Sequence, residues 1–495
     1  MIWQICRAGL IDNLYSRRLQ FVTIATVVLI VLSCLLQINL YRKALQDYNG
    51  KLNTQELFVA EEGELSRLYD MTPPEIAPPP LSMLVRGVPL KSSQSTISQN
   101  LLSPSSFNQN PFPELFPPLD LSSIVLVVLS LIAVMVAHNA ITKEKEAGTL
   151  RLVLSNSVPR WKFIVGKWLA GILSVTPAFV VGILIVFLVA TFSVYSNVQS
   201  SEMGAFFLVV GASLAYIGAF YGVGLAISSL CHSSSTSILI SFVFWILVVL
   251  VLPNIGLYAA AQLRPLPSVH TVEKQIEALM GEERDQTMMK RFQELQARND
   301  AAFQPYLTPF GYTSEQFRAM PDEEKDKLIE KIRATSPEFG NLFAGEQDQI
   351  LETVRTVDYE FRTRTDKMED DLLNKVDQQS RLGMTLTSFL PSSSFLFCVT
   401  NLAGTNPEDV KHFGLQRRQY KNDIIEYIVR RIKTVGGANP SEAHIDLNDR
   451  PRFVFQNRTV RDRLGEAMPY FGVLIAWNLL AFTAAFVSLT RYDVR

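Results

Sequence analysis

Cysteine and histidine are scarce in this chain, which has four of the first and five of the second among 495 residues. The cysteines are Cys6, Cys34, Cys231 and Cys398, and the histidines are His138, His232, His270, His412 and His444. Neither set shows the ligand spacing of a zinc site, and the cysteines are too far apart for a disulfide framework. Metal binding and redox chemistry are therefore not predicted.

A phosphate-binding loop is also missing. Such a loop needs a glycine five residues before a Gly-Lys pair and a serine or threonine directly after it, because backbone amides and that hydroxyl bind the phosphates. At Gly166-Lys167 these two positions hold Trp161 and Trp168. The Ser, His and Asp residues are too scattered to nominate a catalytic triad. We therefore expect no enzyme active site, no bound cofactor and no nucleic-acid partner.

Charge is nearly absent from six long apolar runs, although the chain as a whole is 19% charged and 48% hydrophobic. A bilayer core about 30 Å thick requires roughly 20 apolar residues in a helix, whose backbone amides are bonded within the segment. We predict membrane spans at residues 19–40, 119–138, 163–194, 205–230, 238–261 and 467–489. A proton or sodium relay needs ionisable residues inside the spans, so ion-coupled transport is not predicted.

Two further patterns concern these spans. Gly211, Ala215, Gly218 and Gly222 recur at three- or four-residue steps, which favours close packing of helices. The neighbouring helix belongs either to this chain or to a second copy or a paralogue. Residues 1–18 have the apolar spacing of an amphipathic helix that lies on the membrane ahead of an uncleaved span; a frayed polar terminus is the alternative. The helix includes Trp3, Arg7, Leu10, Arg17 and Arg18.

Lysine and arginine indicate the orientation, because short cytoplasmic loops retain them. Arg17 and Arg18 precede the first span, and Arg491 and Arg495 lie in the tail, residues 490–495. The loop at residues 139–162 and its border carry six more cations, which are Lys143, Lys145, Arg151, Arg160, Lys162 and Lys167. We therefore predict that both termini and this loop are cytoplasmic and that the two long hydrophilic segments are outside.

These hydrophilic segments differ in composition. Residues 41–118 are rich in proline, serine and asparagine and are predicted to be extended or loosely ordered. Residues 262–466 are long enough for a domain and carry mainly helical patterns, with a short strand predicted in RPRFVFQN. Within residues 262–466, the apolar stretch at residues 386–405 is predicted to form an interfacial or partly re-entrant helix. The predicted fold is an all-α polytopic membrane protein with six transmembrane helices, an interfacial N-terminal helix and a mainly helical extracytoplasmic domain between spans 5 and 6.

The stretch KEKEAGTLRLVLSNSVPRWKFIVGKWLAG resembles the loop between the second and third spans of ABC-2-type transporter permeases. In that family an acidic residue, Gly-Thr, a short helix, a Pro-Arg-like turn and a lysine follow one another. Here these are Glu144 and Glu146, Gly148-Thr149, Leu150–Leu154, Ser157–Arg160 and Lys167. LPSSSFLFCVTNLAGT, QRRQY and PRFVFQ resemble the subgroup with a large extracytoplasmic insertion before the last span. That subgroup is linked to multicopper-enzyme maturation, but the insertion here has no metal-ligand cluster, so no copper role is inferred.

The resemblance implies a permease subunit in the bacterial cytoplasmic (inner) membrane. Two such subunits, identical or paralogous, would work with two copies of a separate ABC ATPase, which would bind ATP and Mg²⁺. The interfacial helix and the 139–162 loop would dock on the ATPase; a loop whose charges meet only lipid headgroups is the alternative. The implied coupling residues are Glu144, Glu146, Gly148, Thr149, Leu150, Arg151, Leu154, Arg160 and Trp161.

Three functions stay open at this point. The first is the permease of an ATP-driven exporter. The second is a mechanotransmitter, in which ATP hydrolysis moves the external domain against an extracytoplasmic partner and nothing crosses the bilayer. The third is a membrane scaffold or receptor without an ATPase. The substrate is not predicted.

Overall fold

The computed structural model of the chain describes residues 1–62, 77–87, 119–155, 159–193, 200–435 and 449–492. Helices dominate these residues, and none of them forms a strand. Six helices are long and apolar enough to cross a membrane, namely Arg17–Asn53, Leu121–Glu146, Arg160–Val189, Glu202–Leu230, Ser234–Leu263 and Val460–Arg491. The predicted all-helical, six-span fold class is thereby confirmed.

The chain forms two compact units. The membrane unit contains the described parts of Met1–Ser95, Phe107–Ala260 and Arg381–Arg495, and the hairpin unit contains Ala261–Ser380. The segment predicted as one external domain, residues 262–466, is therefore divided, because its part from Arg381 onward packs with the spans. The location of either part outside the membrane stays a prediction.

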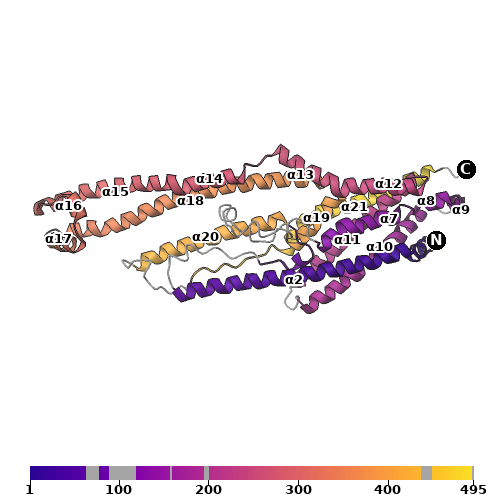
Figure 1. Cartoon of the computed structure of the whole chain (residues 1–495), viewed down its shortest axis with the longest axis horizontal. Helices are drawn as coiled ribbons and strands as arrows, with labels where there is room; N and C mark the ends of the chain where they lie inside the picture. The colour runs from indigo at the N-terminus through magenta and orange to yellow at the C-terminus, as the bar shows by residue number, and fades with distance from the viewer. Residues whose placement is uncertain (63–76, 88–118, 156–158, 194–199, 436–448, 493–495) are drawn as a thin grey trace. The chain divides into compact units, whose positions relative to one another are not determined.

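Figure 1 shows the helices of the membrane unit. They are α1 (Ile2–Leu14), α2 (Arg17–Glu62), η1 (Pro80–Met83), α6 (Leu121–Ser123), η4 (Ile124–Leu129), α7 (Ser130–Ala137), α8 (Thr142–Glu146), α9 (Thr149–Ser155), α10 (Arg160–Ser193), α11 (Ser200–Leu230), α12 (Ser234–Trp245), η6 (Ile246–Val251), α13 (Leu252–Leu263), α19 (Pro391–Ala403), α20 (Pro407–Val435) and α21 (Val460–Arg491).

Helix α11 lies at the centre of the membrane unit and packs against α7, α19 and α21 (Figure 1). Its small residues allow this close approach: a Cβ atom added at Gly224 would lie 2.6 Å from Cβ of Ala137. The buried ring of Tyr216 stacks on Phe395 of α19, with ring centroids 4.6 Å apart, and its hydroxyl donates to the Leu126 carbonyl at 3.0 Å. Most residues of α19 are buried, so it is a core helix of the unit and not a surface helix.

The described residues of the proline-rich segment, 41–62 and 77–87, are more ordered than predicted. Helix α2 continues the first span to Glu62, so the residues from Tyr41 onward are helical there and not extended. The short η1 helix buries Leu81 and Met83 in the core. Asp120 fixes this region, because its carboxylate accepts hydrogen bonds from the backbone amides of Arg86 at 2.9 Å and Ser123 at 2.8 Å.

The predicted strand in RPRFVFQN is also absent, since residues 451–459 run beside α20 without a neighbouring strand. Phe453 and Phe455 instead pack edge to face on Phe413. The backbone amide of Gln456 donates to the Gln416 side chain at 3.0 Å. Aromatic packing on a helix therefore replaces the ladder of backbone hydrogen bonds that a strand requires.

The hairpin unit consists of helices that turn back at one end. They are α14 (Val269–Ala278), η7 (Leu279–Glu283), α15 (Arg284–Leu307), η8 (Thr308–Phe310), α16 (Ser314–Ala319), α17 (Asp322–Thr335) and α18 (Pro337–Thr387), of which α18 continues into the membrane unit. Within the unit α15 and α18 run antiparallel (Figure 1). At the turn Phe303, Leu307, Phe317, Ile332 and Phe339 form a buried core. This core explains how a segment with dense mixed charge folds back on itself.

Candidate functional site

The loop formed by α8 and α9 lies at one end of the membrane unit, beside α1 and the last turn of α21 (Figure 1). Gly148 separates the two short helices with a φ of +69°, a left-handed conformation that strains any residue with a Cβ atom. Leu150 is completely buried and anchors α9 in the core. We call residues 139–162 the α8–α9 loop.

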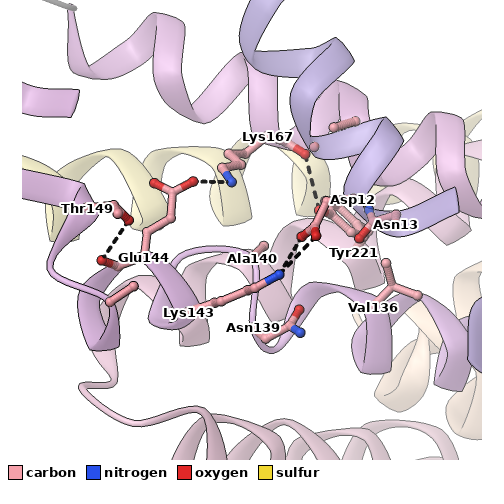
Figure 2. A pocket seen from close by; sticks show the side chains of 13 residues that line it. Asp12, Asn13, Val136, Asn139, Ala140, Lys143, Glu144, Thr149, Lys167 and Tyr221 are labelled. Carbon is pink, nitrogen blue, oxygen red and sulfur yellow. Dashed lines mark hydrogen bonds and ion pairs between the residues drawn. The ribbon is translucent and has the colours of Figure 1, made fainter. Parts of the chain in front are cut away.

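Four consecutive side chains of α8 contact four different helices. The Lys143 ammonium donates to both carboxylate oxygens of Asp12 on α1, at 3.0 and 2.7 Å. Glu144 forms an ion pair with Lys167 on α10, and only 22% and 15% of the two side chains are exposed. Figure 2 shows both pairs. Because successive residues of a helix are rotated by about 100°, neighbouring side chains point to different partners.

The next two side chains of α8 bind helix ends. The Lys145 ammonium donates to the carbonyls of Ser229 and, at 2.9 Å, Cys231, at the end of α11. Glu146 accepts from the backbone amide of Ser234 at 2.6 Å and from its hydroxyl at 2.9 Å, at the start of α12. Both contacts satisfy backbone groups that a helix end leaves unbonded, and each has the favourable charge for that end.

Arg160 connects the loop to the last span. Its guanidinium donates to the carbonyls of Leu489 at 2.5 Å and Thr490 at 2.6 Å, at the end of α21. Together with α8, this contact links the loop directly to α1, α10, α11, α12 and α21. We call the contacts of residues 143–146 and Arg160 the junction.

Three side chains of the loop face outward. Arg151 is exposed, Leu152 is 68% exposed and Trp161 is 47% exposed. The Thr149 hydroxyl donates to the Glu144 carbonyl at 3.3 Å, and Leu154 is half-buried against the core. Glu144 and Glu146 were expected to offer charge to a partner, which stays a prediction. Within the chain Glu144 pairs with Lys167 and Glu146 binds Ser234.

Lys143 and Lys145 were not singled out as coupling residues, although they alternate with the two glutamates. The signal was present in the sequence as the run KEKE, whose alternating charges occupy one turn of helix. Which helices they bind could not be inferred, because Asp12 and Ser229 are far away in the chain.

A family comparison decides what kind of protein this is. The model of the ABC-2 family transporter protein matches residues 3–494. The chain belongs to this family. ABC-2 permeases are membrane components that do not hydrolyse ATP themselves and work with an ABC ATPase. This match confirms the resemblance to ABC-2-type permeases that the α8–α9 loop suggested. A comparison with curated proteins found no match to the chain.

In this ABC-2 permease, α1 has one face on the protein and one open face. A Cβ atom at Gly9 would lie 2.9 Å from Cβ of Ala170, and one at Gly166 would lie 2.8 Å from the Ile5 side chain. Cys6 is buried between these contacts, and burial raises the pKa of its thiol. On α1 Trp3 and Arg7 are exposed and Leu10 is half-buried. Arg17 and Arg18, which were predicted to belong to the same helix, are exposed in the first turn of α2 instead.

The small residues of α11 in the ABC-2 permease contact its own helices. The Asn478 side chain of α21 donates to the Ala215 carbonyl at 2.8 Å. A Cβ atom at Gly218 would lie 2.8 Å from Oδ1 of Asn478, and one at Gly222 would lie 3.1 Å from Cβ of Ala481. Gly211 faces open space. The stripe therefore packs mainly within the chain.

No group of three or more His, Cys, Asp or Glu side chains in the described part of the chain could hold a metal ion. The four cysteines are buried and free.

Proposed function

We propose that the chain is the permease subunit of an ATP-driven ABC exporter and that the α8–α9 loop transmits the movement of a separate ATPase to the spans. The observation that carries this proposal is the junction. Residues 143–146 are bonded to α1, α10, α11 and α12, and Arg160 is bonded to α21. A force applied to this loop therefore reaches five helices through direct polar contacts.

The outward side chains provide a docking surface. Leu152 and Trp161 expose apolar area and Arg151 exposes a guanidinium, which are residue types that dominate binding energy when a partner covers them. In this proposal the inward side chains transmit the movement to the spans, and the outward side chains bind the ATPase. This division refines the expectation that Glu144 and Glu146 meet the partner themselves.

The remaining parts of the proposal follow from the family and the charges. The loop faces the cytoplasm of a bacterium, because its cations obey the positive-inside rule, and both termini lie on that side of the inner membrane. ATP and Mg²⁺ bind to the ATPase and not to this chain. Two ATPase copies and a second permease, identical or paralogous, complete the complex.

Replacing Leu152 by aspartate tests the docking surface. We expect the amount of ATPase that copurifies with the full chain from its native membrane to fall roughly 30-fold, since a hot-spot residue is worth about 2 kcal/mol. The measurement is the molar ratio of ATPase to permease after affinity purification in mild detergent.

Leu415→Asp is the matched control, because Leu415 of α20 is 57% exposed in the same unit but away from the loop. That variant should retain the ATPase. If both variants retain the same amount of ATPase, the proposed docking surface is contradicted. If no ATPase copurifies with the unsubstituted chain, the scaffold or receptor function is favoured.

The mechanotransmitter is the second candidate. It is favoured by the hairpin unit, whose long helices α15 and α18 and buried turn core could pass movement to an extracytoplasmic partner. The two functions differ in whether a continuous path opens between paired permeases. A nucleotide-trapped structure of the complex with a dry, sealed interface throughout would reject export.

A further inference from the structure

A cavity of about 290 Å³ with several charged residues in its lining lies between α1, α8, α10 and α11. Its lining includes Asp12 of α1, Lys143 and Glu144 of α8, Lys167 of α10 and Tyr221 of α11, as well as Asn139 just before α8 (Figure 2). The cavity is much larger than one water molecule needs. It therefore has room for a polar group of several heavy atoms.

The charges of the lining balance each other. Two ammonium groups, of Lys143 and Lys167, face the carboxylates of Asp12 and Glu144. The oxygen Oε2 of Glu144 is buried and has no hydrogen-bond partner among the described residues. Such an atom usually marks a missing water or ligand. A group with both a cation and an anion fits this lining better than one with a single charge.

The cavity is formed by the ends of candidate membrane spans, and the ends of spans lie among lipid headgroups. Lys143 and Glu144 belong to the last turn of the span Leu121–Glu146, and Asp12 precedes the span that begins at Arg17. Lys167 lies seven residues, or about 10 Å, inside the first residue of α10. The wall is thus built from span ends and from the helix that precedes the first span.

We propose that this cavity binds the phosphoethanolamine headgroup of a membrane lipid. The phosphate takes a charge-assisted hydrogen bond from Lys143, and the ammonium donates to the Asp12 carboxylate. The existing Lys143–Asp12 pair opens at little cost, because its side chains are 59% and 60% exposed.

Headgroup chemistry makes the proposal selective. A phosphocholine group carries no N–H and cannot donate to either carboxylate. A phosphoglycerol group has no cation and brings a negative charge close to Asp12 and Glu144. The binding of phosphoethanolamine does not depend on whether an ATPase docks on the loop, so the two proposals fail separately.

The test measures lipids retained by the full chain. The protein is equilibrated with equal amounts of phosphatidylethanolamine, phosphatidylcholine and phosphatidylglycerol in detergent, and the lipids that stay bound after exchange are quantified by mass spectrometry. We expect phosphatidylethanolamine to exceed each of the others several-fold. Asp12→Asn should reduce its retention roughly fivefold to tenfold, as for the loss of one charge-assisted hydrogen bond.

Asp47→Asn is the matched control, because Asp47 is an exposed aspartate of α2 that does not line the cavity, and it should leave retention unchanged. If the unsubstituted chain retains the three lipids equally, the proposal is overturned and the cavity is expected to hold only water. If millimolar glycerophosphoethanolamine displaces the lipid, the phosphoethanolamine group comes from a soluble ester and not from a membrane lipid, which would overturn the proposed lipid.

Discussion

Replacing Glu202 by glutamine is expected to lower the free energy of unfolding of the membrane unit by about 3–5 kcal/mol. Glu202, in the first turn of α11, forms an ion pair with Arg463 of α21, and only 14% and 6% of the two side chains are exposed. Arg463 also donates to the Leu402 carbonyl of α19 at 3.1 Å. Without Glu202 its buried positive charge would have no counter-charge from α11.

The expected loss exceeds that of an ordinary surface pair for a physical reason. A charge held away from water loses its hydration, and the attraction of its partner offsets this cost only while the partner is present. Thermal denaturation of the purified chain in detergent, followed by the loss of the folded peak on size exclusion, measures the effect. Glu202→Gln should unfold at a clearly lower temperature than the unsubstituted chain.

Glu426→Gln serves as the control. Glu426 pairs with Arg430 one turn away on α20, where both side chains are more than 70% exposed, at 73% and 76%. Such a pair contributes about 0.3–0.5 kcal/mol, so its loss should be barely measurable. Replacing Glu202 by glutamine and Arg463 by methionine together should cost less than Glu202→Gln alone; an equal or larger cost would show that the charge itself is unimportant.

This ion pair also has a place in the transmission of movement that we propose. Helix α11 has 31 residues and is about 46 Å long. Its first turn is bonded to α21 through Glu202 and Arg463, and its last carbonyls are bonded to the α8–α9 loop through Lys145. Polar contacts thus hold both ends of the central helix. A displacement of the loop would be carried along α11 as a rigid element.

Replacing Gly171 by alanine is the second change with a large expected effect. A Cβ atom at this position of α10 would lie 1.7 Å from Cζ of Tyr221, which is far inside van der Waals contact. The Tyr221 ring is 2% exposed, and its hydroxyl donates to the Lys167 carbonyl at 3.1 Å. The ring must move or α10 and α11 must separate, at a cost of about 3 kcal/mol or more.

The effect of Gly171→Ala is measured by the same thermal denaturation. Gly211→Ala on α11 is the control, because its Cβ atom would meet nothing within 4 Å. Alanine is the better helix former by about 1 kcal/mol, so this variant should be neutral or slightly stabilising. Similar melting temperatures for both variants would mean that α10 and α11 are not packed as closely as the structure places them.

The spans were predictable because they depend on local composition. An apolar run of sufficient length becomes a helix in a bilayer whatever its neighbours are, since its backbone must bond within the segment. The predicted start of the first span, Leu19, is two residues from the start of α2 at Arg17. The helix continues beyond the predicted end of the span at residue 40, and this continuation was not predicted because Tyr41–Glu62 carries no hydrophobic signal.

The candidate site was predictable only in part. The order of Glu144, Gly148 and Lys167 identified the loop before the spans were placed in space, and Gly148 does adopt the left-handed backbone that ends α8. The partners of the charges were not predictable. Lys143 bonds to a residue 131 positions away and Arg160 to one 329 positions away, and no local pattern carries that information.

The sequence by itself determined that this is a six-span helical membrane protein of the ABC-2 family type without a phosphate-binding loop, because hydropathy and motif order are properties of short segments. Only the tertiary structure decided that four consecutive charges bind four helices, that the α11 stripe packs within the chain, and that residues from Arg381 onward belong to the membrane unit. The physical reason is that a charge or a small residue restricts the kind of neighbour it accepts. Which neighbour it meets depends on how distant segments pack together.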